Sequence, residues 1–162
     1  MKFDPVGICA ALTEAGVEFV VLGGFAAIIH GSPLPTEDID VIPSRAGDNL
    51  ERLATALTRL KAKIRTGDEP IETRIDAAFI RNMPHMLNLE TQLGDIDLVF
   101  TPAGALKTYE QWLERSRRAQ LREGLIVSVA DLDDVIESKT AANRPKDLRS
   151  LPYLQSLRDE LG

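Results

Sequence analysis

The sequence predicts an α/β fold of the α+β kind, in which a short mixed sheet is flanked by helices and followed by a helical C-terminal extension. Two largely apolar runs, Val17–Leu22 and Ile39–Ile42, end at a glycine or a proline and have the character of buried strands. Leucines repeat at helical spacing between Asn49 and Leu60, and helical patterns return after residue 130. Strands and helices therefore share one chain.

The size of the chain suits one compact unit. A chain of 162 residues, 44% of them hydrophobic, is long enough for a single core and short for two domains of usual size. We therefore expect one domain over residues 1–162, with its core over about 1–130 and the C-terminal helices over about 131–162.

Caps and breakers place the elements of the N-terminal half. Asp4 and Pro5 are typical of a helix start, Gly16 and Gly31 of a helix end, and Pro43 of a strand end. The expected elements are a helix over 5–15, a strand over 17–22, a short helix over 25–30, a stiff proline-containing connection over 32–35, a strand over 39–42 and a helix over 49–60.

The C-terminal half is predicted in the same way, apart from residues 65–84. There, residues 67–70 have loop character and residues 71–81 fit either a helix or an irregular segment. The later elements are a hairpin of 87–93 and 96–100 that turns at Gly94, a helix from Thr101-Pro102 to Leu113, two short strands within 119–129, and helices over 131–142 and from Pro145. We expect the last helix to carry four leucines along one side, which are Leu148, Leu151, Leu154 and Leu157.

The charge balance argues against general nucleic-acid binding. Such binding needs many Lys and Arg side chains to neutralise phosphates, whereas the formal net charge here is −6. A local exception is a cluster of four arginines, Arg115, Arg117, Arg118 and Arg122. It either contacts an anionic group or forms a solvated charged face.

The single cysteine and the N-terminal segment bear on the compartment. Cys9 has no partner for an internal disulfide, and its place in an apolar helical pattern predicts a buried, unreactive thiol in a reducing environment. Asp4, Pro5 and Glu14 interrupt the apolar run that a secretory signal needs, and no later run has membrane-spanning length. We expect a cytoplasmic protein with no membrane partner.

Three aspartates in strand settings predict a metal site. Asp38 and Asp40 are two residues apart on a strand, so their side chains project from the same face about 6–7 Å apart along the backbone. Mg²⁺ is a hard cation that prefers such oxygen ligands. Asp97 lies between Ile96 and Leu98, where an unpaired charge is costly to bury, and is the expected third carboxylate. Asp95 shares its face and is the alternative.

A glycine pair precedes these aspartates. Gly23 and Gly24 leave the first strand, lack a Cβ and can approach phosphate oxygens closely, and the helix that follows offers unpaired N–H groups. By itself such a pair is more often a simple turn. The order of apolar strand, Gly-Gly, short helix, proline-containing loop and Asp-x-Asp strand is what points to a nucleotide.

With these motifs the chain resembles the nucleotidyltransferase superfamily typified by DNA polymerase beta. The resemblance lies in Leu22–Ala27, His30-Gly31, Thr36 with Asp38 and Asp40, and Gly94–Leu98, and is greatest to the small prokaryotic branch of minimal and AbiEii-type nucleotidyltransferases. It continues near the C-terminus, where residues 139–148 follow a K-x4-R-x-K-D-L pattern. The resemblance therefore implies a nucleotidyltransferase-like sheet.

The resemblance also implies roles for particular residues. Asp38 and Asp40 would bind Mg²⁺ or Mn²⁺, and Asp97 would be the third ligand and activate the acceptor. Four residues would contact the nucleotide, which are Gly23, Gly24, Lys139 and Lys146. The tail has a structural alternative, in which Arg144 or Lys146 bridges to Asp147. Gly24 departs from the family, which usually has a serine there, so phosphate binding would use backbone donors.

Two functions follow from the resemblance. The first is a metal-dependent enzyme that moves a nucleoside monophosphate from an NTP to a hydroxyl of a protein, an RNA end or a small molecule, in a toxin–antitoxin or phage-defence system. The alternative is a non-catalytic, antitoxin-like or regulatory binding protein on the same fold, with a cognate toxin or antitoxin as partner. The C-terminal helices could also form a homodimer. Acceptor determinants are expected in residues 65–84 and in the Arg115–Arg122 cluster.

Overall fold

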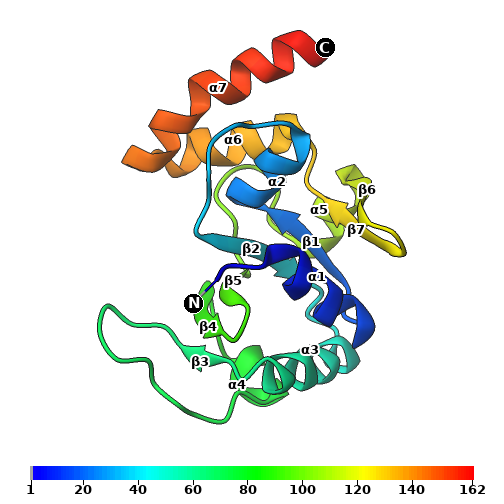
Figure 1. Ribbon diagram of the computed structural model, residues 1–162, viewed down its shortest axis with the longest axis vertical. Helices are drawn as coiled ribbons and strands as arrows, with labels where there is room; N and C mark the ends of the chain where they lie inside the picture. Colours follow the sequence, from blue (N-terminus) through cyan, green and yellow to red (C-terminus); the bar gives the residue numbers. More distant parts are fainter. Residues whose placement is uncertain (1) are drawn as a thin grey trace.

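The computed structural model describes residues 2–162 and contains a seven-stranded mixed sheet with the strand order β3-β4-β5-β2-β1-β7-β6 (Figure 1). No helix in this part of the chain is both long and apolar enough to cross a membrane. The strands are β1 Phe19–Leu22, β2 Asp38–Pro43, β3 Lys63–Ile64, β4 Met86–Thr91, β5 Gly94–Val99, β6 Arg117–Arg122 and β7 Leu125–Val129.

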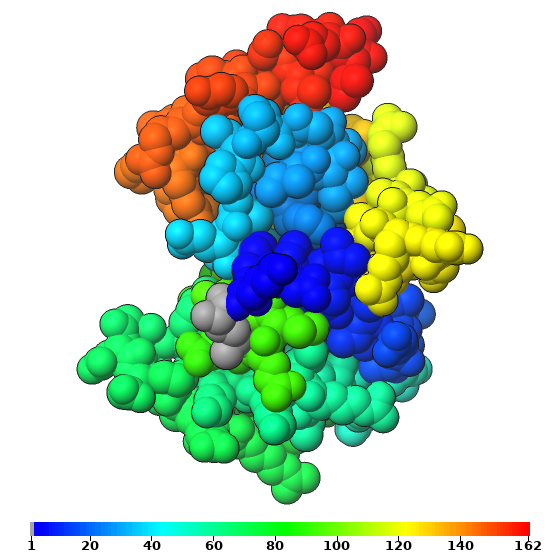
Figure 2. Space-filling model, viewed as in Figure 1, coloured from blue at the N-terminus to red at the C-terminus, as the bar shows by residue number. Residues whose placement is uncertain are grey.

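Helices pack around this sheet, and the last two extend from one end of it. The helices are α1 Pro5–Glu14, α2 Gly23–His30, α3 Gly47–Arg59, α4 Ala77–Arg81, α5 Tyr109–Arg115, α6 Leu132–Ala142 and α7 Pro145–Leu161. α7 packs on α6, and α6 packs on α2. Figures 1 and 2 show α7 at one end of the molecule and the segment after β3 projecting near the other. The predicted α/β fold with a helical C-terminal extension is thus confirmed.

The strand register determines which aspartates become neighbours. β2 pairs with β1 in the antiparallel sense and with β5 in the parallel sense. In the β2–β5 pair, Asp38 is opposite Asp95 and Asp40 is opposite Asp97. The apolar residues between them, such as Ile39 and Ile96, are fully buried and fix this register, because a shift by one residue would expose them.

The helix predicted to open at Thr101-Pro102 begins only at Tyr109, so the prediction was wrong for its first part. Gly104 has a φ of +108°, which interrupts a helix, and the Ala105 N–H donates to Glu137 on α6. Thr108 is the actual N-cap and accepts from the Gln111 N–H at 3.2 Å. A capping box therefore decided the helix start.

The prediction of one leucine face on the last helix was also wrong in part. Leu151 and Leu154 are buried, but Leu148 is 52% exposed. Each step of three residues turns the side chain by about 60° short of a full revolution, so a run of four cannot share one face. Within residues 65–84, the structure has a short α4 capped by the Asp76 side chain, and the two-residue β3 lies just before this stretch.

Cys9 on α1 is fully buried, as predicted, and burial raises the pKa of its thiol to about 12. Because the thiolate is the reactive form, we expect the native protein to react with a disulfide reagent at pH 8 at least about a hundredfold more slowly than the protein unfolded in guanidinium. Absorbance of the released thiol measures both rates. Fast labelling of one thiol per native chain would contradict this prediction.

Candidate active site

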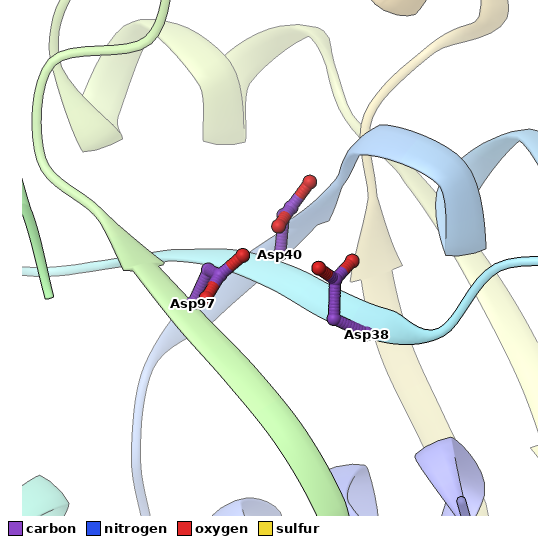
Figure 3. Close-up of side chains that lie close together, drawn as sticks. All are labelled: Asp38, Asp40 and Asp97. Atoms are coloured by element: carbon purple, nitrogen blue, oxygen red, sulfur yellow. The ribbon is translucent and has the colours of Figure 1, made fainter. Parts of the chain in front are cut away.

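Three carboxylates converge at the centre of the sheet, as the strand pattern predicted. Asp38 and Asp40 project from β2 and Asp97 from the neighbouring β5, and Figure 3 shows the three side chains on the same side of the sheet. Each residue contributes one carboxylate oxygen, and these three oxygens lie within 4.8 Å of one another. Asp95 is one register step away and faces Arg65 at 3.5 Å, so the structure does not place it in this cluster.

The cluster is electrostatically strained by its own charges. Burial raises the pKa of Asp40 to about 7, with added contributions from the charges of Asp38 and Asp97. Burial also raises the pKa of Asp97, which is 7% exposed, although the Arg65 guanidinium works in the opposite direction. Like charges this close favour the protonated form unless a cation joins them. The site therefore has an electrostatic preference for positive charge.

The glycine pair lies directly against this cluster. Gly23 has a φ of +66°, and a Cβ there would overlap the Asp40 carboxylate. Gly24 lies beside Thr36, whose hydroxyl oxygen would be 2.9 Å from a Cβ at position 24. Thr36 in turn donates to the Asp38 carbonyl at 3.1 Å. Neither glycine therefore carries a side chain where β1 turns into α2. Thr36 fills the space that a side chain on residue 24 would take.

A cleft of about 990 Å³ opens over the cluster and the glycines. All seven residues predicted for the site line it, including Lys139 on α6 and Lys146 on α7. Its basic side chains, apart from Arg65, come from the α6–α7 region and are Lys139, Arg144, Lys146 and Arg149. Besides Asp97, the lining residues from β4, β5 and the segment after β5 are uncharged, and they are Met86, Asn88, Val99, Thr101, Pro102 and Ala103.

Several solved structures have a similar fold. The lincosamide antibiotic adenylyltransferase LnuA, lincomycin-bound, is similar with a TM-score of 0.65 and 12% identity over 97% of this chain and 99% of LnuA. ANT(2")-Ia in complex with adenylyl-2"-tobramycin is similar with a TM-score of 0.59 and 16% identity, over 96% of this chain and 86% of that protein. The chain has the nucleotidyltransferase fold.

A third similar structure with this nucleotidyltransferase fold is the Thermotoga maritima protein TM1012, with a TM-score of 0.51 and 14% identity over 96% of this chain and 89% of that protein. No protein-family model matches the sequence, and no curated protein sequence matches it significantly. The likeness is therefore one of fold, and it confirms the fold that the resemblance implied.

The donor set suits a divalent cation in this nucleotidyltransferase fold. All three predicted ligands offer carboxylate oxygens, which Mg²⁺ and Mn²⁺ prefer, and their spacing needs only small side-chain movements to meet one ion. A cation there would also counter the burial and the charge repulsion that together raise the pKa of Asp40. Asp38, Asp40 and Asp97 therefore fit a metal centre.

The two predicted lysines lie in different environments. Lys139 is 3.6 Å from the buried Asp147, which also binds Arg144, so the structural alternative for the tail holds for Arg144. Lys146 forms no ion pair within residues 2–162, and its charge offsets a small part of the rise in the pKa of Asp40 that burial and the neighbouring carboxylates cause. Lys146 is thus the lysine with a free ammonium group beside the carboxylates.

Sequence reasoning missed one charged residue at the centre of the site and misplaced others. Arg65 contacts Asp97 directly, but it lies in the stretch where no periodic pattern was visible. None of the four arginines of the Arg115–Arg122 cluster lines the cleft. Arg115 pairs with Asp134 at 2.8 Å and Arg117 pairs with Asp131, so part of that cluster is neutralised locally.

Substitution of Gly23 by alanine is expected to damage the site more than the fold. The new Cβ would push on the Asp40 carboxylate, and a positive φ costs a non-glycine residue about 1 kcal/mol. We expect Mn²⁺ affinity, measured by electron paramagnetic resonance, to fall at least about tenfold. Gly124→Ala is the matched control, because Gly124 also has a positive φ but meets no atom within 4 Å. Equal effects of the two substitutions would contradict the proposed contact.

Proposed function

We propose that the protein is a Mg²⁺- or Mn²⁺-dependent nucleotidyltransferase that moves a nucleoside monophosphate from an NTP to a hydroxyl group. The observation that carries this proposal is the convergence of Asp38, Asp40 and Asp97 beside the bare Gly23-Gly24 turn in one cleft. Nucleotidyl transfer depends on positioning and on charge neutralisation, and these residues offer the parts for both.

We assign the triphosphate to the part of the cleft where hydrogen-bond donors and positive charges lie. Backbone N–H groups of Gly23 and Gly24, at the start of α2, suit the triphosphate oxygens, and Lys146 suits the same anion from α7. Lys139 lies on α6, and part of its positive charge is already neutralised by Asp147 at 3.6 Å. We therefore assign the main cationic contact to Lys146 and a secondary one to Lys139.

The reaction follows from where the carboxylates lie. A bound divalent cation supplies Lewis-acid neutralisation of the triphosphate. Asp38 and Asp40 hold the nucleotide end of the cluster, and Asp97 faces the acceptor, whose hydroxyl proton it draws away. The acceptor oxygen forms a bond to the α-phosphorus while the bond from that phosphorus to the bridging oxygen breaks. Pyrophosphate leaves with the electron pair.

We assign the acceptor to the part of the cleft that is lined by β4, β5 and the segment after β5. This part favours a small molecule without several positive charges. Apart from Asp97, the lining side chains from β4, β5 and the segment after β5 are uncharged, and within residues 2–162 no carboxylate lines the cleft besides the three of the cluster. A polyamine would need further carboxylates to replace its hydration. LnuA with lincomycin and ANT(2")-Ia with its adenylylated tobramycin support a small-molecule acceptor over a protein or an RNA end.

Incubation with each α-labelled NTP, Mg²⁺ or Mn²⁺ and a small-molecule extract or lysate tests the proposal. We expect a labelled product that is small, depends on the metal and is absent with chelator. Labelled protein or RNA would contradict the acceptor class. Absence of any labelled product, together with absence of metal-dependent NTP binding by calorimetry, would contradict the enzyme.

The cellular setting and the partners belong to the same proposal. We propose a cytoplasmic enzyme, built as one domain, that works in a toxin–antitoxin or phage-defence setting. Leu148, Tyr153 and Leu161 are exposed on α7 and support contact with a second copy or with a cognate protein. A stable complex formed without NTP, found by native mass spectrometry, would instead favour the non-catalytic binding protein.

A further inference from the structure

We propose that Arg65 is the positioning residue for Asp97 and a fixed positive charge at the carboxylate cluster. The inference rests on the proposed function and deepens it. Arg65 follows β3 at the edge of the sheet, and its side chain reaches across β4 to the cluster on β5. It is the one basic residue lining the cleft, within residues 2–162, that contacts a member of the cluster directly.

The guanidinium is anchored independently of Asp97. The Arg65 backbone N–H donates to the Asn88 carbonyl at 2.9 Å, and its Nη1 donates to the Leu89 carbonyl at 3.0 Å. The same Nη1 lies 3.5 Å from an Asp95 oxygen. The side chain is only 23% exposed. A residue bonded to β4 through both its backbone and its guanidinium is a rigid reference point rather than a mobile surface charge.

This anchoring fixes the orientation of the third carboxylate. Nη2 of Arg65 donates to Oδ1 of Asp97. An ionised carboxylate has two oxygens with about four lone-pair sites, so Asp97 can accept this hydrogen bond and still offer an oxygen toward Asp38 and Asp40. Because the guanidinium is itself held by the Leu89 carbonyl, this bond favours one rotational setting of the carboxylate. Asp95, drawn to the same guanidinium, is thereby kept out of the cluster.

The same charge works against the cation in the nucleotide-free protein. Arg65 offsets part of the negative charge that attracts a divalent ion, because its guanidinium contacts Asp97 and lies 3.5 Å from Asp95. Tight ion binding should then require the added negative charge of the triphosphate. Arg65 therefore couples metal binding to nucleotide binding while it orients Asp97.

Arg65→Gln separates these effects from a merely structural role. At pH 8 without nucleotide, we expect Mn²⁺ to bind the variant about 5- to 20-fold more tightly than the wild type, measured by electron paramagnetic resonance. With nucleotide and acceptor, we expect kcat to fall at least about tenfold and KM for NTP to change by less than about threefold. Weaker or unchanged Mn²⁺ binding would overturn the charge role, and unchanged kcat would overturn the positioning role.

Two further variants keep the test decisive. Arg65→Lys retains the charge but not the fork, so Mn²⁺ affinity should stay within about twofold while kcat still falls; it decides the positioning role if Arg65→Gln does not fold. Arg45→Gln is the matched control, because Arg45 binds the Arg81 carbonyl at 2.7 Å and stacks on Phe100, outside the cleft. It should alter melting temperature alone. The Mn²⁺ titration needs no turnover, so it stands even if the wild type transfers no nucleotide.

Discussion

Replacing Asp38 and Asp40 together with asparagine is expected to abolish nucleotidyl transfer, with turnover at least about a thousandfold lower than in the wild type. Both carboxylates lie on β2 beside the Gly23 turn, and one oxygen of each belongs to the cluster. Asparagine keeps the shape of the side chain but removes the negative charge that holds a divalent cation. Metal-dependent NTP binding should disappear in calorimetry at the same time.

The same double substitution should leave the fold intact or make it more stable. The pKa of Asp40 is raised to about 7, so its carboxylate binds a proton more readily in the folded than in the unfolded chain. A raised pKa of an acid destabilises the folded state increasingly from about pH 4 to pH 7, and the penalty is fully present above that range. We expect the metal-free variant at pH 8 to be more stable by about 2 kcal/mol, seen as a higher melting temperature.

A control variant distinguishes the loss of these two carboxylates from the loss of any two negative charges on the protein. Asp48 on α3 and Asp133 on α6 have side chains that are 75% and 60% exposed, and neither lines the cleft. The double variant Asp48→Asn with Asp133→Asn should therefore transfer nucleotide at the wild-type rate. If turnover persisted in the Asp38 and Asp40 variant, the carboxylate cluster would not be the reacting centre.

The strands that carry the site could be predicted because buried strands leave a strong local pattern. Apolar residues such as Ile39 and Ile96 must face the interior, and the two-residue period then places Asp38 with Asp40 and Asp95 with Asp97 on the same side. Choosing Asp97 over Asp95 rested on the costs of burying a charge, and the structure places Asp97 in the cluster. Local periodicity and burial were sufficient there.

Two other features were missed for different reasons. Arg65 reaches Asp97 across 32 positions of sequence, and β3 is too short, at two residues, to give a period. The start of α5 was decided by Thr108 and Gln111, which outweighed the proline at position 102. The Arg65 contact follows from tertiary packing, so a pattern in the sequence alone could not reveal it. The capping box of Thr108 and Gln111 is a local signal that the sequence analysis overlooked.

The largest effect on stability is expected from Asp147→Ala. Asp147, at the start of α7, is fully buried, and Arg144 Nε donates to it at 2.7 Å, while Lys139 of α6 lies at 3.6 Å. Its carboxylate also accepts the Arg144 backbone N–H at 3.1 Å. Alanine would leave Lys139, whose side chain is only 14% exposed, without its anionic partner and would remove the helix cap.

We expect Asp147→Ala to lower the free energy of unfolding by about 2–4 kcal/mol, and the melting temperature by about 10 °C, measured by urea and thermal unfolding. Asp147→Asn should lose less, because an amide oxygen can still accept from the Arg144 N–H. Asp159→Ala is the matched control, since Asp159 on the same helix has a side chain that is 76% exposed.

Arg144 and its backbone bond hold the pKa of Asp147 below its usual range. The stability that Asp147 contributes is thus present at neutral pH and declines as pH falls below about 4, so the gap between wild type and Asp147→Ala should narrow in acid. A gap that stayed constant from pH 7 to pH 3 would mean that side-chain packing, and not the buried charge, joins α7 to α6.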